Sequence, residues 1–437
     1  MSPLTPSLLI TSVFALAGIA AAAPPSLPLK LDFGSGKVEA GYTQVTPDLT
    51  YSDDRGFGFE PGSGVTAIDR KTADALRGDF VTSDEPFFFS VAVPDGNYKV
   101  TVTLGDAGGE ASDTTVKAEL RRLMLNGVKT DAGKTETRSF VVNVRTPDYP
   151  GGKVKLKVPR ESVDEAWAWD PRLTLEFNGA RPCVSAIEIE KIDVPTVFLL
   201  GDSTVCDQSG EPYASWGQML TAFFKPTVAV ANHGESGETL RSSTGAKRID
   251  KVLSQMKKGD YLFIQFGHND QKSKDADAVE QYKASLKDWV AKVKAKGGTP
   301  VLVTPMLRHR FQGSTVTNSL GDYPDKVREA AKEEGVPLID LNVMSKSLYE
   351  ALGPKQSVHL FKHEGDDLTK FDGTHHSPYG AYELAQCIVE GIRQNKLDLA
   401  SHVAGDFKGF DPAKPDAPET FKLPASPRRS TTKPAGS

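Results

Sequence analysis

The sequence has few cysteines, no excess of basic charge and only one long apolar run. Its 437 residues include 3 cysteines (Cys183, Cys206 and Cys387), 52 Lys and Arg, and 57 Asp and Glu. Three scattered cysteines are too few for a disulfide scaffold or a cysteine-rich zinc module. A net charge of −5 argues against binding nucleic acid through its phosphates, which needs a basic excess. Because the single apolar run lies at the N-terminus, an integral membrane protein is excluded.

That N-terminal run, residues 8–23, predicts an export signal. It ends in four alanines before Pro24-Pro25, and small residues suit a cleavage site. The run is short for a membrane-spanning helix, although a retained membrane anchor is the alternative. We assign residues 1–23 to a signal peptide and expect a secreted or periplasmic protein.

Residues 25–193 predict an all-β domain. Turn clusters such as Pro94-Asp95-Gly96-Asn97 recur along this stretch, and no long helical period interrupts them, so we expect a β-sandwich. Phe87-Phe88-Phe89 is interpreted as core packing rather than a sugar-binding platform. Trp167 and Trp169 would face the same way on a strand, where they could form an exposed binding patch. The alternating runs that predict strands are 88–93, 98–104, 140–144 and 154–158.

From residue 194, strand-like and helix-like segments alternate, which indicates a parallel sheet covered on both faces. This pattern predicts a three-layer α/β domain with a five-stranded sheet over residues 194–404. Residues 405–437 are rich in Pro, Lys, Ser and Thr and predict a disordered tail. The expected strands are 197–200, 228–231, 262–266, 301–304 and 338–341. The expected helices are 215–224, 249–256, 279–296, 325–334 and 378–393.

Polar motifs follow the first three of these strands, and a fourth motif precedes the last helix. In an open parallel sheet the carboxyl ends of the strands share one edge, so we expect the four motifs to converge there. The motifs are Gly201-Asp202-Ser203-Thr204, Asn232 through Gly237, Gly267-His268-Asn269-Asp270, and Asp372-Gly373-Thr374-His375.

Together the motifs supply what acyl transfer needs. Ser203 is the candidate nucleophile and His375 the base that takes its proton, while Asp372 fixes the tautomer of that base. The negative oxygen of a tetrahedral intermediate needs donors already in place. The backbone N–H groups of Ser203 and Gly237, with the side-chain amide of Asn269, are the expected oxyanion hole.

The motifs resemble those of the SGNH, or GDSL-type, hydrolases, and most closely the rhamnogalacturonan acetylesterase branch. Leu31-Asp32-Phe33-Gly34 and Gly56-Phe57-Gly58-Phe59 resemble the start of the β-sandwich that often accompanies bacterial members. The resemblance implies a flavodoxin-like SGNH domain after a galactose-binding-like sandwich. It also implies a serine acyl-enzyme mechanism without metal or organic cofactor, and an acetylated plant cell-wall polysaccharide as substrate, most of all rhamnogalacturonan (pectin).

Other residues and other functions stay open at this point. Arg308, His309 and Arg310 follow the fourth strand and could bind the carboxylates of an acidic polysaccharide, or could be solvated loop charges. His359 and His363 have the spacing of metal ligands on a helix, but their charged segment favours a loop, and we assign no metal site. The alternatives are another SGNH ester hydrolase (an acetylxylan esterase or a lipolytic enzyme) and a non-catalytic glycan-binding protein. The complete set of nucleophile, base and acid argues against the last.

Overall fold

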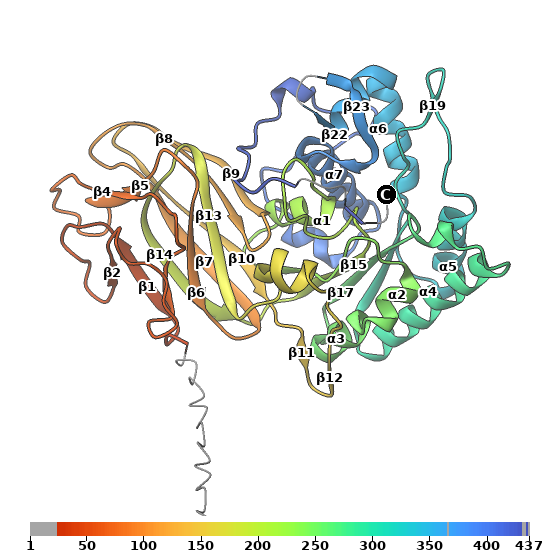
Figure 1. Ribbon diagram of the computed structural model, residues 1–437, viewed down its shortest axis with the longest axis horizontal. Coiled ribbons are helices and arrows are strands. Elements are labelled where there is room, and N and C mark those ends of the chain that lie inside the picture. Colours follow the sequence, from red (N-terminus) through yellow and green to blue (C-terminus); the bar gives the residue numbers. More distant parts are fainter. Residues whose placement is uncertain (1–23, 365–366, 431–433, 436–437) are drawn as a thin grey trace, which may run out of the picture.

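The computed structural model describes residues 24–364, 367–430 and 434–435. It consists of an all-β domain beside an α/β domain (Figure 1). The predicted signal peptide lies outside the described residues. In the part of the chain that the structure describes, no helix combines the length and the apolar character needed to cross a membrane.

The N-terminal domain is a sandwich of two mostly antiparallel sheets. One sheet has the order β10-β7-β14-β1-β2, with β5 paired to β14 and β4 to β5, and the other has the order β3-β6-β13-β8-β9. The strands of the first sheet are β1 (Leu29–Phe33), β2 (Thr43–Val45), β4 (Thr66–Asp69), β5 (Asp79–Thr82), β7 (Gly96–Gly105), β10 (Thr135–Val144) and β14 (Cys183–Ile192). Those of the second are β3 (Phe57–Phe59), β6 (Phe87–Ala92), β8 (Ser112–Ala118), β9 (Arg122–Thr130) and β13 (Arg172–Arg181).

Apolar side chains that alternate along these strands fill the space between the two sheets. Phe33 from the first sheet meets Phe89 from the second edge to face, with ring centroids 4.9 Å apart, a favoured aromatic geometry. Phe87 and Phe89 are fully buried in the same cluster. The interpretation of the phenylalanine run as core packing is therefore confirmed for these two residues.

Two expectations for the sandwich are wrong. Residues 154–158 form no strand, and the chain there leads from the hairpin of β11 (Asp148–Tyr149) and β12 (Gly152–Lys153) into helical turns. Trp167 lies in one of these turns and Trp169 directly follows it, so the two do not face the same way on a strand. Trp169 is buried, with its ring against His233 of the α/β domain. Trp169 would lie on the surface of the sandwich alone, and contact with the α/β domain buries it.

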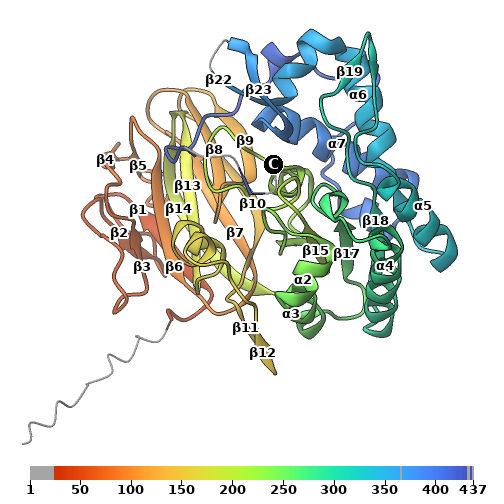
Figure 2. The same ribbon diagram turned by 45° about the vertical axis from the view of Figure 1, so that its right-hand side comes forward.

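The α/β domain has a parallel sheet with the order β16-β15-β17-β18-β21. Figure 2 shows its strands β15, β17 and β18 side by side. Numbered along the chain this is the order 2-1-3-4-5 of flavodoxin-like folds, whose strand order reverses between the first and third strands. Ligands bind outside the carboxyl ends at that point, here between β15 and β17. The strands are β15 (Thr196–Gly201), β16 (Ala229–Asn232), β17 (Tyr261–Gln265), β18 (Thr299–Val303) and β21 (Leu338–Ile339).

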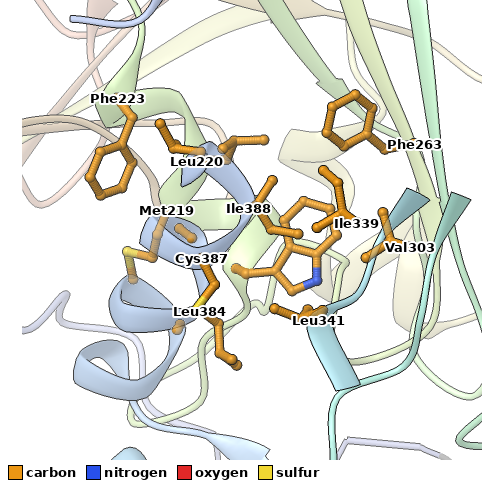
Figure 3. Close-up of a cluster of buried hydrophobic side chains, with 14 of the residues drawn as sticks. Met219, Leu220, Phe223, Phe263, Val303, Ile339, Leu341, Leu384, Cys387 and Ile388 are labelled. Atoms are coloured by element: carbon orange, nitrogen blue, oxygen red, sulfur yellow. The ribbon is translucent and has the colours of Figure 1, made fainter. Parts of the chain in front are cut away.

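Helices cover both faces of this sheet because its strands are apolar on both sides. On one face Phe263 and Val303 pack with Ile388 of α7 (Figure 3). On the other face Leu262 packs with Trp289 of α4. The helices are α1 (Trp216–Met219), α2 (Leu240–Gly245), α3 (Arg248–Gln255), α4 (Ala278–Ala295), α5 (Tyr323–Glu334), α6 (Leu341–Gln356) and α7 (Pro378–Gln394).

The predicted strands and helices of this domain are found, while α2 and α6 were not predicted. The run of α6 is interrupted by Gly353, which has φ +70°, and by Pro354, both of which obscure a helical pattern. Two short hairpins complete the domain: β19 (Phe311–Gln312) with β20 (Thr315–Val316), and β22 (Phe361–Glu364) with β23 (Asp367–His376).

The prediction of a disordered tail is wrong for residues 405–430. Phe407 packs edge to face on Phe223, with ring centroids 5.6 Å apart. Further along, Ser426 is buried, and residues 428–430 hydrogen-bond on both sides of the Glu211 backbone. Composition missed this order because the few apolar side chains of the tail, such as Phe407 and Phe421, pack on the α/β domain, and polar partners in both domains hold residues 424–430. We call residues 424–430 the strap.

Candidate active site

The four polar motifs lie beyond the carboxyl ends of β15, β16 and β17, with the last one on β23. Ser203 follows β15 by two residues, in a turn closed by backbone N–H groups that donate to the Asp202 carbonyl. A Cβ on Gly201 would come within 2.6 Å of the Gln265 carbonyl oxygen on β17. Only glycine therefore lets β15 end so close to its neighbour and present the serine at the point where the strand order reverses.

Ser203, His375 and Asp372 form a continuous hydrogen-bonded chain. Ser203 Oγ lies 2.8 Å from His375 Nε2, and His375 Nδ1 lies 2.9 Å from Asp372 Oδ2. The other carboxylate oxygen accepts the backbone N–H groups of Thr374 and His375. Burial alone would raise the pKa of Asp372, but its bond to His375 and these N–H groups outweigh burial and hold the pKa at about 2. An ionised Asp372 retains the proton on Nδ1 and leaves Nε2 to accept the serine proton.

The nucleophile is buried rather than at the surface. Ser203 and His375 are each 2% exposed. Neighbouring groups cover them: Gln208 donates to the Ser203 carbonyl, and the Tyr213 ring stands edge-on to His375. This low exposure lowers the local dielectric, in which an oriented donor stabilises a developing negative charge more strongly than it would in water.

Buried hydrogen bonds fix the turn that carries Ser203. Trp216 Nε1 donates to Gln265 Oε1 over 2.8 Å, and Gln265 Nε2 donates to Thr204 Oγ1 over 2.7 Å. Thr204 in turn donates its hydroxyl and its backbone N–H to Asp202. The residues flanking the nucleophile are thus anchored to the end of β17.

The second and third motifs are joined directly to one another. Asn269 Nδ2 donates to the Glu238 carbonyl over 3.0 Å, and Asp270 accepts the backbone N–H of Leu240. Gly237 precedes Glu238 with φ +77°, a left-handed conformation that favours glycine. An amide nitrogen carries two hydrogens, so the bond to Glu238 orients Asn269 and uses only one of them.

Comparison with known proteins identifies the family of both domains. Residues 197–388 match the model of the GDSL-like lipase/acylhydrolases, and residues 29–144 match that of the beta-agarase/YXIM esterase-like, galactose-binding domain-like family. Rhamnogalacturonan acetylesterase RhgT of Bacillus subtilis is 38% identical over 216 residues, which are 47% of this chain and 93% of RhgT. The chain belongs to the GDSL-like lipase/acylhydrolase family. It is a carboxylic ester hydrolase with a galactose-binding-like domain before its SGNH domain.

A longer match covers both domains of this GDSL-like hydrolase. The uncharacterized esterase YxiM of Bacillus subtilis is 29% identical over 389 residues, which are 84% of this chain and 91% of YxiM. The crystal structure of YxiM aligns with a TM-score of 0.46 and 26% identity over 85% of this chain and 99% of that one.

The three candidate substrate contacts of the hydrolase differ in their surroundings. Arg308 is half-buried and donates to Thr374 Oγ1 and to the His268 carbonyl, each over 3.1 Å, so it connects the third and fourth motifs. His309 bonds to Ser357 and lies within a cluster of phenylalanine rings. Arg310 is exposed.

One pair inside the motifs had no role in the sequence interpretation. Asp202 Oδ2 lies 3.4 Å from His268 Nδ1, and both side chains are buried. Burial would raise the pKa of Asp202, but the charge of His268 and hydrogen bonds from His268 and Thr204 outweigh burial and lower it. The pair joins the Ser203 turn to the Asn269 loop. Its signal was available, since both residues stand in the motifs, but only the fold shows that they meet.

The histidines and cysteines outside the triad form no metal centre in the described ranges. His359 and His363 lie in a 3-10 turn and a strand rather than on one helix, and no described group of three or more His, Cys, Asp or Glu could hold a metal ion. All three cysteines are buried and free. Burial raises the pKa of Cys206 well above its usual value, so this thiol beside Ser203 is a poor nucleophile.

Replacing Asn269 with alanine should lower kcat on the order of 10²–10³, the loss that follows removal of one oxyanion donor. Hydrolysis of p-nitrophenyl acetate measures it. Asn126→Ala is the matched control because Asn126 is exposed on β9 in the sandwich. Equal kcat values for Asn269→Ala and the wild type would show that this amide does not bind the oxyanion.

Proposed function

We propose that this hydrolase removes O-acetyl groups from a plant cell-wall polysaccharide, most of all from acetylated rhamnogalacturonan. The observation that carries the chemistry is the hydrogen-bonded chain from Ser203 through His375 to Asp372, held at the reversal point of the sheet. The substrate class is supported by the name of RhgT, to which nearly half of this chain is 38% identical.

In the proposed mechanism, Ser203 Oγ attacks the acetyl carbonyl carbon while His375 Nε2 takes its proton. Asp372 stabilises the imidazolium, and the N–H groups of Ser203 and Gly237 with the Asn269 amide bind the oxyanion. The intermediate collapses when the sugar oxygen leaves with the proton from His375, and the acetyl group stays on Ser203. His375 then takes a proton from water as the water oxygen attacks the acetyl carbon. The bond from that carbon to Ser203 Oγ breaks, His375 returns the proton to Ser203, and acetate is released.

Acetate release from acetylated rhamnogalacturonan, acetylated xylan and a long-chain p-nitrophenyl ester tests the substrate. We expect release from the pectic polymer, little from xylan and little hydrolysis of the long acyl chain. Release from xylan alone would retain the chemistry and contradict the pectic assignment. Preference for the long acyl chain would favour a lipolytic enzyme, and no hydrolysis of any ester would contradict the proposed function.

We also propose that the protein is exported, because its polymeric substrate would lie outside the cell and residues 8–23 have the composition of a signal. The molecular mass of the protein, measured by mass spectrometry on the form secreted by the native host, tests this. A mature form lacking about the first 23 residues is expected, and a full-length form retained in the membrane would favour the anchor.

A further inference from the structure

Two cationic side chains from the N-terminal part of the chain reach the loop that carries Gly237. Lys157 and Arg160 follow β12 and precede β13, so they belong to the sandwich half of the sequence. Lys157 Nζ donates to the Ser236 carbonyl oxygen over 2.7 Å, and Arg160 Nη2 donates to the same oxygen over 2.8 Å. One backbone carbonyl of the catalytic domain therefore accepts two charged hydrogen bonds from the other domain.

This carbonyl belongs to the same peptide group as the Gly237 N–H. A trans peptide is planar, with its oxygen and its amide hydrogen on opposite sides. Fixing the oxygen of Ser236 therefore fixes the direction of the Gly237 N–H, which points away from the two cations. Charge-assisted hydrogen bonds are about twice as strong as neutral ones, and a chain of hydrogen bonds polarises its members. Two cations on the oxygen make the N–H a better directed and stronger donor.

The residues on either side of this peptide are held from the same direction. Arg160 also forms an ion pair with Glu235, and Lys157 forms one with Glu238 over 3.0 Å. The two glutamate side chains are almost completely buried. The loop from Glu235 to Glu238 thus has a glutamate side chain at each end and a carbonyl in the middle, and each of the three contacts Lys157 or Arg160 from outside its own domain.

A third cation, Arg248, connects the Glu235–Glu238 loop to the sandwich half of the chain. Arg248 of α3 is fully buried, lies 3.7 Å from Glu238 and donates to Glu161 over 2.6 Å. Glu161 lies in the helical turn that begins at Arg160. The turn is therefore anchored to the catalytic domain independently of the two bonds to Ser236, which argues for a defined position of Lys157 and Arg160.

We propose that Lys157 and Arg160 are positioning residues of the oxyanion hole, so that the sandwich half of the chain takes part in catalysis through the Ser236–Gly237 peptide. This inference rests on the proposed function, since it takes Gly237 as an oxyanion donor. It assigns the N-terminal half a role beyond binding glycan or supporting the fold.

The test compares Lys157→Met, Arg160→Met and the double variant with the wild type on p-nitrophenyl acetate. The double variant should lose roughly 10- to 100-fold in kcat. Removing an oxyanion donor lowers kcat on the order of 10²–10³, and displacing the Gly237 N–H should lower it less. KM should change little, because the oxyanion that the Gly237 N–H stabilises forms only after the ester has bound. Lys157→Arg and Arg160→Lys should recover most of the loss, because each retains a charged donor.

Lys251→Met is the matched control. Lys251 of α3 is buried and pairs with Asp95 of the sandwich, so its loss weakens domain contact without touching the Glu235–Glu238 loop. An equal loss of kcat in this control would show that domain contact in general is being measured and would overturn the inference. An unchanged kcat in the double variant would also overturn it. An inactive wild type would instead contradict the proposed function.

Discussion

The Ser203→Ala variant should lose about 10⁴–10⁶ in kcat while its fold stays intact, because triad residues act as a unit and residual rate comes only from binding and oxyanion donors. Ser203 Oγ hydrogen-bonds to His375 and its side chain is 2% exposed. Alanine fits the same space and removes only this oxygen. Acetate release from p-nitrophenyl acetate and the thermal unfolding midpoint are the two measurements.

Ser209→Ala is the control for Ser203→Ala, because Ser209 lies six residues further along the same connection and only partly buried. Its kcat should equal that of the wild type. A Ser203→Ala variant that retains more than about 1% of the wild-type rate would show that another group attacks the ester, since removing a triad nucleophile costs far more.

Asp372→Asn should lower kcat by about 10³–10⁴, because an amide facing His375 favours the wrong imidazole tautomer. The amide oxygen can still accept the backbone N–H groups of Thr374 and His375, so the turn should survive. Asp367→Asn, on the same strand but exposed, is the control and should leave kcat unchanged. A small effect of Asp372→Asn would mean that His375 is oriented by another group.

The same variant has a pH signature. The folded pKa of Asp372 is about 2 against an ordinary value of 3.8. A lowered carboxyl pKa stabilises the fold above the unfolded value and loses that contribution as pH falls through the folded value. The wild type should therefore lose about 2 kcal/mol of unfolding free energy relative to Asp372→Asn between about pH 4 and pH 2. Urea unfolding at several pH values measures the difference, and a constant difference would contradict the lowered pKa.

The candidate site could be predicted because its motifs stand next to recognisable elements: Ser203 and Asn269 follow apolar strands, and Asp372 and His375 precede the last helix. Parallel topology alone brings Ser203 and Asn269 to one edge of the sheet. The short spacing from Asp372 to His375 lets the carboxylate reach the imidazole. Helices such as α4 and α7 were found because their apolar positions recur with a helical period. Helices of this kind depend on a local pattern of apolar residues, which a single sequence contains.

What could not be predicted depends on contacts between distant segments. Trp169 was interpreted as part of an exposed patch, but the α/β domain covers its side chain. Lys157 and Arg160 resemble ordinary charges of a loop, and nothing local marks an acceptor 79 or 76 residues away. The bonds of Arg308 to the third and fourth motifs likewise join segments that are far apart in the sequence. Long-range polar contacts leave no period in the sequence.

The strap has a consequence for biosynthesis. Lys117 of the sandwich is buried with Glu176 and Glu211, and its ammonium also donates to the Pro424 carbonyl and to Ser426 Oγ, each over 2.7 Å. The ribosome makes residues 424–430 after both domains. In a nascent chain that still lacks them, the Lys117 ammonium has lost two of its acceptors, and the Glu211 backbone has lost its hydrogen-bond partners on the strap. The junction between the domains is therefore completed by the part of it that leaves the ribosome last.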